Sequence, residues 1–276
     1  MAQAISRSLL NRSALPLMWC AGCGNGIVLN ALLCALDDLD LKKEDVLVVT
    51  GIGCWGKADD YILANALHVT HGRALAFATG AKAANPKLNV IVLMGDGDGT
   101  TIGGNHLIHS ARRNMDLTAI IVNNLNYGMT GGQYSATTPN GAITSTSVGG
   151  NPERGFDVCD LVRAAGANYV ARESVTSGMR LRNRIVAGIQ KKGFSLIEAM
   201  SPCSTLFGPR NKMRNPVDML RNLKEKAVSQ AKFDAIENAA EQGYFVTGVI
   251  VDKDVPDFNT SYEGERAAIL AAKGGK

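Results

Sequence analysis

The sequence is poor in aromatic residues and has no long apolar run. Phe, Trp and Tyr make up 5% of its 276 residues, against 46% for all hydrophobic residues, so a core would consist mainly of Ala, Val, Ile and Leu. No apolar run reaches the ~18 residues of a membrane-spanning helix. The opening segment MAQAISRSLL lacks the apolar centre of a secretion signal. We therefore expect a cytoplasmic protein with one large α/β domain and an appendage, or with two small domains.

Concentrated positive charge is also scarce. The formal net charge is +4, but the basic residues are scattered, apart from a cluster at Arg210, Lys212 and Arg214. Dedicated nucleic-acid-binding proteins gather such residues on one face, so we expect no nucleic-acid partner. A mildly basic surface suits anionic cofactors and acidic electron-transfer partners.

Near-continuous apolar runs alternate with helical patterns along most of the chain. Such runs are typical of parallel strands that are buried on both faces of a sheet, and the alternation predicts a doubly wound α/β fold. The predicted strands are 46–51, 89–95, 117–124 and 194–200, and the predicted helices are 26–38, 57–68, 103–113, 157–166 and 176–191.

Two segments depart from this alternation. Residues 126–156 are rich in Gly, Thr, Ser and Asn, and a loop this long within a compact domain is usually functional. After residue 203 come a polar segment, a charged helix at 216–240, a strand-like stretch at 243–251 and a polar tail. We expect a domain over residues 1–203 and a C-terminal arm over residues 204–276 that docks another subunit.

An acidic turn and an asparagine turn follow two consecutive predicted strands. Strand 89–95 leads into Asp96 of the turn GDGDG, and strand 117–124 ends in Asn123-Asn124. If the strands are neighbours, Asp96 and Asn124 lie at the carboxyl edge of the sheet, where such folds bind ligands. Their oxygens suit Mg²⁺ or Ca²⁺ with phosphate oxygens completing the shell, and the glycines allow a pyrophosphate close to the backbone.

Each half of this pattern has an ordinary alternative. GDGDG could be a simple turn, and the two asparagines could be a strand-end cap. The two turns together, separated by the length of one βαβ crossover, are a far more specific signal than either turn alone. A calcium-binding EF-hand loop is excluded, because no acidic residue closes a 12-residue loop from Asp96. We expect Asp98 to bond loop amides.

Four of the six cysteines fall in predicted loops. Cys20 and Cys23 form a C-x-x-C, while Cys54 and Cys203 each follow a predicted strand. Their thiolates could converge near Asp96 and hold either Zn²⁺ or a [4Fe–4S] cluster. The spacing does not decide between these metals, and C-x-x-C is also a redox motif.

The other two cysteines, Cys34 and Cys159, fall within helical patterns among apolar neighbours. Cysteine in such a place behaves as a small core residue. We expect neither of them to bind metal.

A series of motifs resembles the beta subunits of 2-oxoacid:ferredoxin oxidoreductases, over roughly residues 17–205. In chain order these are WCAGCG, GIGC, HGRALAFATGAKAANP, IGGNHLIHSARRN, NNLNYGMTGGQ and SPC. The GDG and NN turns resemble the thiamine-diphosphate motif of the transketolase and pyruvate-decarboxylase superfamily. Ala21 and Ala136 depart from the family, which more often has Pro at both positions.

The resemblance implies a thiamine-diphosphate domain of the diphosphate-binding type, with three cofactors. It implies Mg²⁺ bound by Asp96, Asn124 and the carbonyl of Asn126, and a [4Fe–4S] cluster on Cys20, Cys23, Cys54 and Cys203. The residues expected to contact thiamine diphosphate are Thr79, Gly80, Gly95, Asp96, Gly97, Asp98, Asn124, Asn126, Gly128, Met129, Thr130 and Cys54.

The implied reaction is oxidative decarboxylation of a 2-oxoacid. Coenzyme A takes the acyl group, CO₂ leaves, and the electrons pass through the cluster to ferredoxin. The opening motif and the arm resemble 2-oxoglutarate enzymes most, with branched-chain 2-oxoacids and pyruvate as alternatives. An alpha subunit is implied because the glutamate that activates the cofactor lies on another domain, and small gamma and delta subunits are further candidates. No ferredoxin-type cysteine run occurs in this chain.

Two side chains are candidates for contact with the substrate. The resemblance puts His71 near the active site, and Lys57 could pair with an anionic substrate group or be a solvated lysine at a helix start. Two alternative functions, from other classes of protein, remain open. A non-oxidative thiamine enzyme would leave the four loop cysteines without a role, and a zinc-stapled nucleotide-binding module would not explain NNLNYGMTGGQ.

Overall fold

The computed structural model describes residues 8–274. Residues 1–7, which form most of the N-terminal segment considered above, lie outside the described part. The main sheet has seven strands in the order β2-β1-β3-β4-β6-β5-β9. All neighbouring pairs are parallel except β5 with β9, which is antiparallel. The strands are β1 (Val46–Thr50), β2 (Asn65–His68), β3 (Asn89–Gly95), β4 (Thr118–Asn123), β5 (Tyr169–Ser174), β6 (Ser195–Met200) and β9 (Gly248–Asp252).

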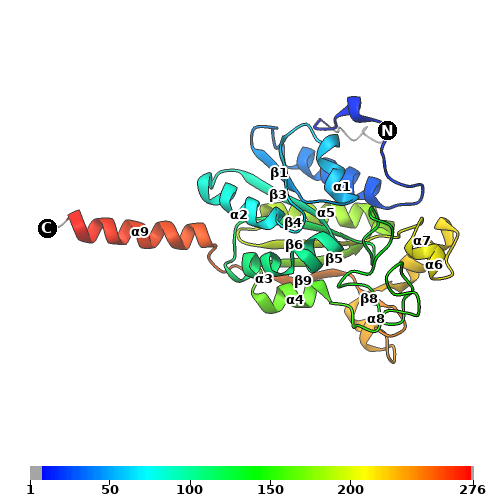
Figure 1. Cartoon of the computed structure of the whole chain (residues 1–276). Helices are drawn as coiled ribbons and strands as arrows, with labels where there is room; N and C mark the ends of the chain where they lie inside the picture. The colour runs from blue at the N-terminus through cyan, green and yellow to red at the C-terminus, as the bar shows by residue number, and fades with distance from the viewer. Residues whose placement is uncertain (1–7, 275–276) are drawn as a thin grey trace.

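Helices cover both faces of this sheet and make two apolar cores (Figure 1). One core forms between the sheet and helices α1 (Asn25–Asp38) and α5 (Gly178–Gln190). The other forms on the opposite face with α2 (Ala74–Ala84), α3 (Gly104–Arg112) and α4 (Val158–Ala165). Every residue of β1, β4 and β5 is buried. The predicted doubly wound α/β fold is confirmed.

Before residue 203, two elements differ from the prediction. The helix predicted over 57–68 is wrong, because the 3-10 helix η2 (Trp55–Tyr61) ends early and is followed by the edge strand β2. All four residues of β2 are exposed, so this strand leaves no apolar run in the sequence. Strand β5 was not predicted, because Arg172 and Glu173 interrupt its apolar pattern. Both are buried and paired with opposite charges.

Residues beyond 203 form a small irregular layer and a projecting helix. The predicted helix over 216–240 is divided, because Ser229 starts a new helix by accepting a hydrogen bond from the amide of Lys232. The predicted strand-like stretch contributes β9, so part of the arm belongs to the main sheet. The elements are α6 (Phe207–Arg210), α7 (Pro216–Lys226), β7 (Ala227–Val228), α8 (Gln230–Asp234), β8 (Phe245–Val246) and α9 (Phe258–Gly274).

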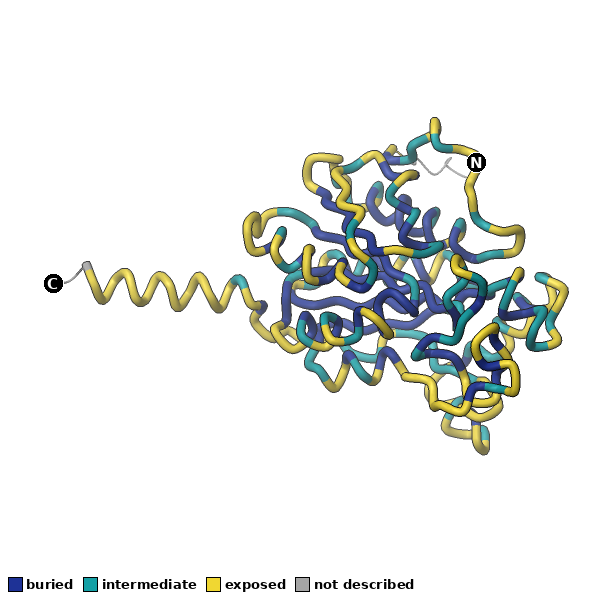
Figure 2. The backbone as a smooth tube through the Cα atoms, in the orientation of Figure 1, coloured by how far each residue is buried: buried dark blue, intermediate teal, exposed yellow. Residues whose placement is uncertain are grey.

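Helix α9 extends away from the body of the molecule, and it is exposed from Thr260 to Lys273 (Figure 2). None of the described helices has both the length and the apolar character needed to cross a membrane. The long loop between β4 and α4 contains no helix or strand. It folds back over the carboxyl edge of the sheet, where Thr137 and Ser135 reach Asp96.

Candidate active site

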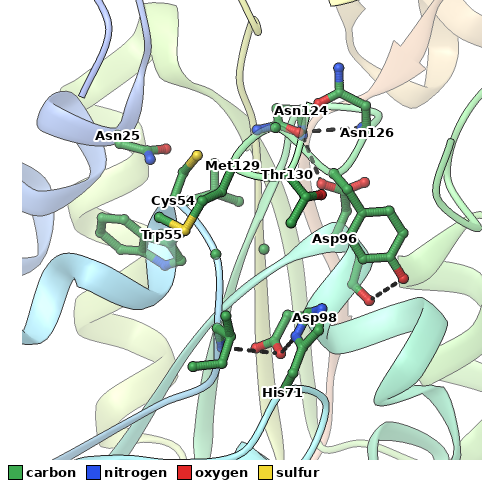
Figure 3. Close-up of a pocket in the computed structure, with 17 residues that line it drawn as sticks. Asn25, Cys54, Trp55, His71, Asp96, Asp98, Asn124, Asn126, Met129 and Thr130 are labelled. Atoms are coloured by element: carbon green, nitrogen blue, oxygen red, sulfur yellow. Dashed lines mark hydrogen bonds and ion pairs between the residues drawn. The ribbon is translucent and has the colours of Figure 1, made fainter. Parts of the chain in front are cut away.

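A cavity lies at the carboxyl edge of the sheet, where the loops after β1, β3 and β4 meet (Figure 3). Asn25 at the start of α1 and His71 before α2 complete its wall. The ends of parallel strands meet there because all of these strands run the same way. The remaining lining residues are Ile52, Gly53, Cys54, Trp55, Gly95, Asp96, Gly97, Asp98, Val122, Asn124, Asn126, Tyr127, Gly128, Met129 and Thr130.

Oxygen atoms cluster where the two polar turns meet. The Oδ1 of Asn124 lies 3.2 Å from Asp96 Oδ1, 2.7 Å from the Asn126 carbonyl oxygen and 3.2 Å from Asn126 Oδ1. Turning the Asn124 amide would replace these contacts by hydrogen bonds, but Asn124 Oδ1 already accepts one from the Asn126 amide at 3.3 Å. Ligands of an octahedral Mg²⁺ at ~2.1 Å lie about 3 Å from one another. The spacing of these oxygens therefore fits a divalent cation.

The carboxylate of Asp96 is fixed from its other side. Its Oδ2 accepts hydrogen bonds from Ser135 Oγ at 2.5 Å and from Thr137 Oγ1 at 2.8 Å. Burial raises the pKa of Asp96 to about 6, although these hydrogen bonds act in the opposite direction. A cation beside Oδ1 would favour the charged carboxylate. Ser135 and Thr137 could not be identified from the sequence, where their only signal was the polar character of the loop that contains them.

Asp98 fastens two loops around the cavity. Its Oδ1 accepts hydrogen bonds from the Gly72 amide at 2.6 Å, His71 Nδ1 at 2.5 Å and the Ile52 amide at 3.4 Å. The carboxylate lies so close to Gly51 that a Cβ there would be 2.0 Å from Asp98 Oδ2. Gly51 is therefore required for this packing.

Several polar atoms on the cavity wall have no partner. Asp98 Oδ2, Asn126 Nδ2 and both side-chain polar atoms of Asn25 are buried without a hydrogen bond within the described part of the chain. Buried polar atoms are nearly always bonded in folded proteins. These three residues line one cavity, and their unused donors and acceptors could bind a polar ligand there.

The three cysteine-bearing loops are tied together beside this cavity. Trp19 Nε1 donates a hydrogen bond to the Cys54 carbonyl at 2.6 Å. The Gly24 amide donates to Ser201 Oγ at 3.2 Å. Ser204 Oγ donates to the Ala21 carbonyl at 2.8 Å. These contacts join the segments that contain Cys20, Cys23, Cys54 and Cys203.

The four thiols share one neighbourhood. Burial raises the pKa of Cys54 to about 11, and Cys23, Cys203 and Cys20 add to the rise. Burial also raises the pKa of Cys23, with smaller contributions from Cys20 and Cys203. Between residues 8 and 274, no group of three or more His, Cys, Asp or Glu side chains could together hold a metal ion. The mutual influence of the four thiols shows that they are neighbours beside the cofactor cavity.

Cys34 and Cys159 lie elsewhere, and both are buried. Cys34 packs within α1, and Cys159 Sγ donates to Glu198 Oε2 at 3.3 Å. The structure thus divides the cysteines into the same two groups as the sequence patterns.

Of the residues predicted to contact the cofactor or the substrate, three lie off the cavity wall. Lys57 pairs with Asp60 Oδ2 at 2.7 Å, and it does not line the cavity. Thr79 Oγ1 donates to the Leu75 carbonyl within α2, and Gly80 is on the exposed surface of that helix. Thr79 and Gly80 follow the first turn of α2, whose start is the part near the cavity, and their contact with a cofactor stays a prediction.

Comparison with known proteins agrees with this site. Residues 51–199 match the family described as thiamine pyrophosphate enzyme, C-terminal TPP binding domain. The chain is 47% identical over 248 residues to 2-oxoglutarate synthase subunit KorB of Methanothermobacter marburgensis, covering 90% of this chain and 87% of the relative. It is 46% identical over 249 residues to the subunit of the same name from Methanocaldococcus jannaschii, with 90% and 92% covered.

A solved structure is similar along nearly its whole length. It is the 2-oxoglutarate:ferredoxin oxidoreductase from Magnetococcus marinus with 2-oxoglutarate, coenzyme A and succinyl-CoA bound. The TM-score is 0.82 at 26% identity, with 96% of this chain and 94% of that chain covered.

The fold and the site therefore define a thiamine-diphosphate-binding enzyme domain. Within this class, the chain belongs to the beta-subunit family of the 2-oxoacid:ferredoxin oxidoreductases. The resemblance noted in the sequence is confirmed, and the chain is a subunit of an oxidoreductase. Its relatives are themselves named as subunits, so the family functions as multi-subunit enzymes.

Proposed function

We propose that this chain is the beta subunit of a 2-oxoglutarate:ferredoxin oxidoreductase that works in the cytoplasm. The complete enzyme would convert 2-oxoglutarate and coenzyme A to succinyl-CoA and CO₂, and pass the electrons to ferredoxin. The names of the relatives support this substrate. The observation that carries the proposal is the cluster of facing oxygens on Asp96, Asn124 and Asn126 at the cavity wall.

In this proposal Asp96 Oδ1, Asn124 Oδ1 and the Asn126 carbonyl would bind Mg²⁺, and the ion would hold the diphosphate of thiamine diphosphate. Ser135 and Thr137 hold the Asp96 carboxylate in place through its other oxygen. The unpartnered atoms of Asn25, Asn126 and Asp98 are available to the cofactor or substrate. Thiamine diphosphate, when bound, supplies the nucleophilic carbon and the electron sink for decarboxylation.

Cys20, Cys23, Cys54 and Cys203 are proposed to bind a [4Fe–4S] cluster. Three hydrogen-bonded loops support this set. Cys54 lines the cofactor cavity, and a Cβ on Gly128 would lie 3.4 Å from its sulfur. Electrons would therefore have a short path from cofactor to cluster.

The substrate is tested by assaying the co-purified complex with several 2-oxoacids, coenzyme A and a viologen dye. We expect 2-oxoglutarate to give the highest kcat/KM. A preference for pyruvate or a branched-chain 2-oxoacid would contradict the substrate and leave the reaction class unchanged.

The enzyme is proposed to need an alpha subunit that supplies the activating glutamate, with gamma and delta subunits and ferredoxin as further partners. Beta purified to homogeneity should show no 2-oxoacid-dependent dye reduction, because its cavity lacks that group. Adding purified alpha should restore turnover. Sustained turnover by beta alone would refute the partner requirement.

His71 is proposed to contact the substrate, because it lines the cavity with Nδ1 bound to Asp98. His71→Ala should lower kcat/KM at least tenfold, about 1.4 kcal/mol. Lys57 serves as the matched control, since its ammonium pairs with Asp60 instead. Lys57→Ala should leave kcat/KM within about twofold. A large loss of kcat/KM in Lys57→Ala, with little loss in His71→Ala, would instead identify Lys57 as the substrate-binding group.

The C-terminal arm, residues 204–276, is proposed to dock the alpha subunit through α9. From Thr260 to Lys273 this helix is exposed, and it presents Tyr262, Ile269 and Leu270 at 55%, 57% and 59% exposure. Most of the stability of a helix in a protein comes from tertiary packing of its apolar side chains, and this helix of 17 residues leaves these three side chains exposed. A subunit that covered these side chains would stabilise it.

Tyr262→Ser combined with Ile269→Ser should weaken the affinity of alpha for beta at least tenfold. Each buried apolar side chain contributes about 1.5–3 kcal/mol, and both side chains are more than half exposed on beta alone. The melting temperature of beta alone should therefore stay constant. Glu263→Ala on the same helix is the control, with affinity measured by biolayer interferometry. Unchanged affinity in the double variant would remove α9 from the interface.

A further inference from the structure

A buried row of polar side chains crosses three neighbouring strands behind the proposed Mg²⁺ site. Arg172 on β5 donates from Nε to Glu198 Oε2 on β6 at 2.6 Å. Asn123 at the end of β4 donates from Nδ2 to Glu198 Oε1 at 2.8 Å. The register explains these contacts, since Arg172 is opposite Glu198, which is opposite Ile121, two residues before Asn123. The three side chains belong to residues that are 6%, 1% and 3% exposed.

Glu198 determines which way the Asn123 amide faces. An ionised carboxylate only accepts hydrogen bonds, so the NH₂ group of Asn123 must face Glu198. Its Oδ1 is thereby directed to the other side, where it accepts from the Leu125 amide at 3.1 Å and lies 3.0 Å from Thr137 Oγ1. An amide turned the other way would present NH₂ to the Leu125 N–H, and neither could accept.

Leu125 needs this support because its backbone is in the left-handed region, with φ of 65°. Residues other than Gly, Asn and Asp rarely adopt this conformation, because it brings Cβ too close to the backbone carbonyl oxygen. Asn123 Oδ1 holds the Leu125 amide, and Thr138 Oγ1 donates to the Leu125 carbonyl at 2.6 Å. The strained residue lies between Asn124 and Asn126, so its conformation sets the relative position of both proposed ligands.

The row also reaches the third ligand. Thr137 Oγ1 lies between Asn123 Oδ1 and Asp96 Oδ2, at 3.0 Å and 2.8 Å. The position of the Asn123 amide therefore bears on Asp96 as well as on the turn from Asn124 to Asn126.

A buried ion pair is weak evidence for stability, because apolar side chains of similar size often serve the fold as well. From its connections we infer that Glu198, held by Arg172, is a positioning residue that orients the Asn123 amide and so sets the Mg²⁺-binding turn. This inference rests on the proposed function, which assigns Asp96, Asn124 and Asn126 to the metal. Residues that orient metal ligands typically change metal affinity by about 10- to 100-fold when they are replaced.

Glu198→Gln tests the orientation with almost no change in volume. The side-chain amide of Gln has one acceptor, its oxygen, and one donor group, its NH₂. The Arg172 guanidinium can only donate, so it would bind the Gln oxygen. The Gln NH₂ then faces the Asn123 NH₂, so we expect the amide to turn. The affinity for Mn²⁺, measured by electron paramagnetic resonance on the alpha–beta complex with thiamine diphosphate, should fall about 10- to 100-fold.

Adding Arg172→Met to Glu198→Gln should restore the affinity to within about threefold of wild type, because Gln can then turn its oxygen back to Asn123. A role limited to packing would predict no rescue, since the second change disturbs the core further. Lys82→Met is the matched control. It breaks the ion pair of Lys82 with Asp116, which is 2.7 Å long and lies far from the cavity; the two side chains are 4% and 12% exposed. This control should leave the Mn²⁺ affinity within about twofold of wild type. Thermal unfolding of all variants reports on folding.

The outcomes separate the inference from the function on which it rests. Wild-type affinity in Glu198→Gln, or equal loss in the single and double variants, overturns the positioning role. If the wild-type complex does not bind Mn²⁺ with thiamine diphosphate, or if Asp96→Ala binds it as tightly, the proposed metal site itself is wrong. Loss in Glu198→Gln with rescue by Arg172→Met supports the inference.

Discussion

Asp96→Ala should weaken Mg²⁺-dependent binding of thiamine diphosphate at least about 100-fold, which corresponds to about 2.8 kcal/mol. Asp96 supplies the only negative charge among the three proposed ligands, and its Oδ1 faces the other oxygens at the cavity wall. Isothermal titration calorimetry on the alpha–beta complex measures the loss directly. Circular dichroism should show that the fold is retained, because the sheet does not depend on this side chain.

Asp96→Asn separates the charge from the hydrogen bonds. It keeps an acceptor for Ser135 and Thr137, so the loop is disturbed less, and binding should still be strongly weakened. Asp60→Ala removes a carboxylate that is 48% exposed and pairs with Lys57, and it should bind the cofactor as wild type does. Near-wild-type affinity in both Asp96 variants would exclude Asp96 as a metal ligand.

The sequence was most informative where a local pattern reports directly on burial. Strands β1, β3, β4 and β6 each leave an apolar run, and the turns after β3 and β4 could be identified from the same runs. Strand β5 could not, because Arg172 and Glu173 are neutralised by partners that only the tertiary structure brings near. Strand β2 lies at an exposed edge and has no pattern to detect.

The candidate site divides in a similar way. Asp96 and Asn124 could be paired from the sequence because the ends of neighbouring parallel strands meet. Ser135 and Thr137 could not be assigned, because they reach Asp96 from positions 39 and 41 residues away through an irregular loop. Thr79 and Gly80 were expected at the cofactor from a motif, and their place on α2, outside the cavity lining, leaves that expectation a prediction.

The cysteines allow the sharpest test of the proposed electron acceptor. Serine at Cys20, Cys23, Cys54 or Cys203 should each lower bound iron, sulfide and cluster absorbance, because iron in such clusters prefers the softer sulfur ligand. Electron transfer to ferredoxin should fall with them. Thiamine diphosphate should still bind in these variants, since its proposed metal site uses only oxygen ligands.

Cys34→Ser is the matched control, because Cys34 is equally a free thiol but is buried within α1. Its new hydroxyl needs a partner, and the expected cost is at most about 1–3 kcal/mol of stability, with iron content unchanged. Cys159→Ser should also keep its iron, since a hydroxyl can donate to Glu198 as the thiol does. Iron and sulfide analysis of all six variants, on complexes purified without oxygen, decides the ligand set. Loss of the cluster in Cys34→Ser or Cys159→Ser, with full iron in one of the four loop variants, would assign the cluster to different ligands.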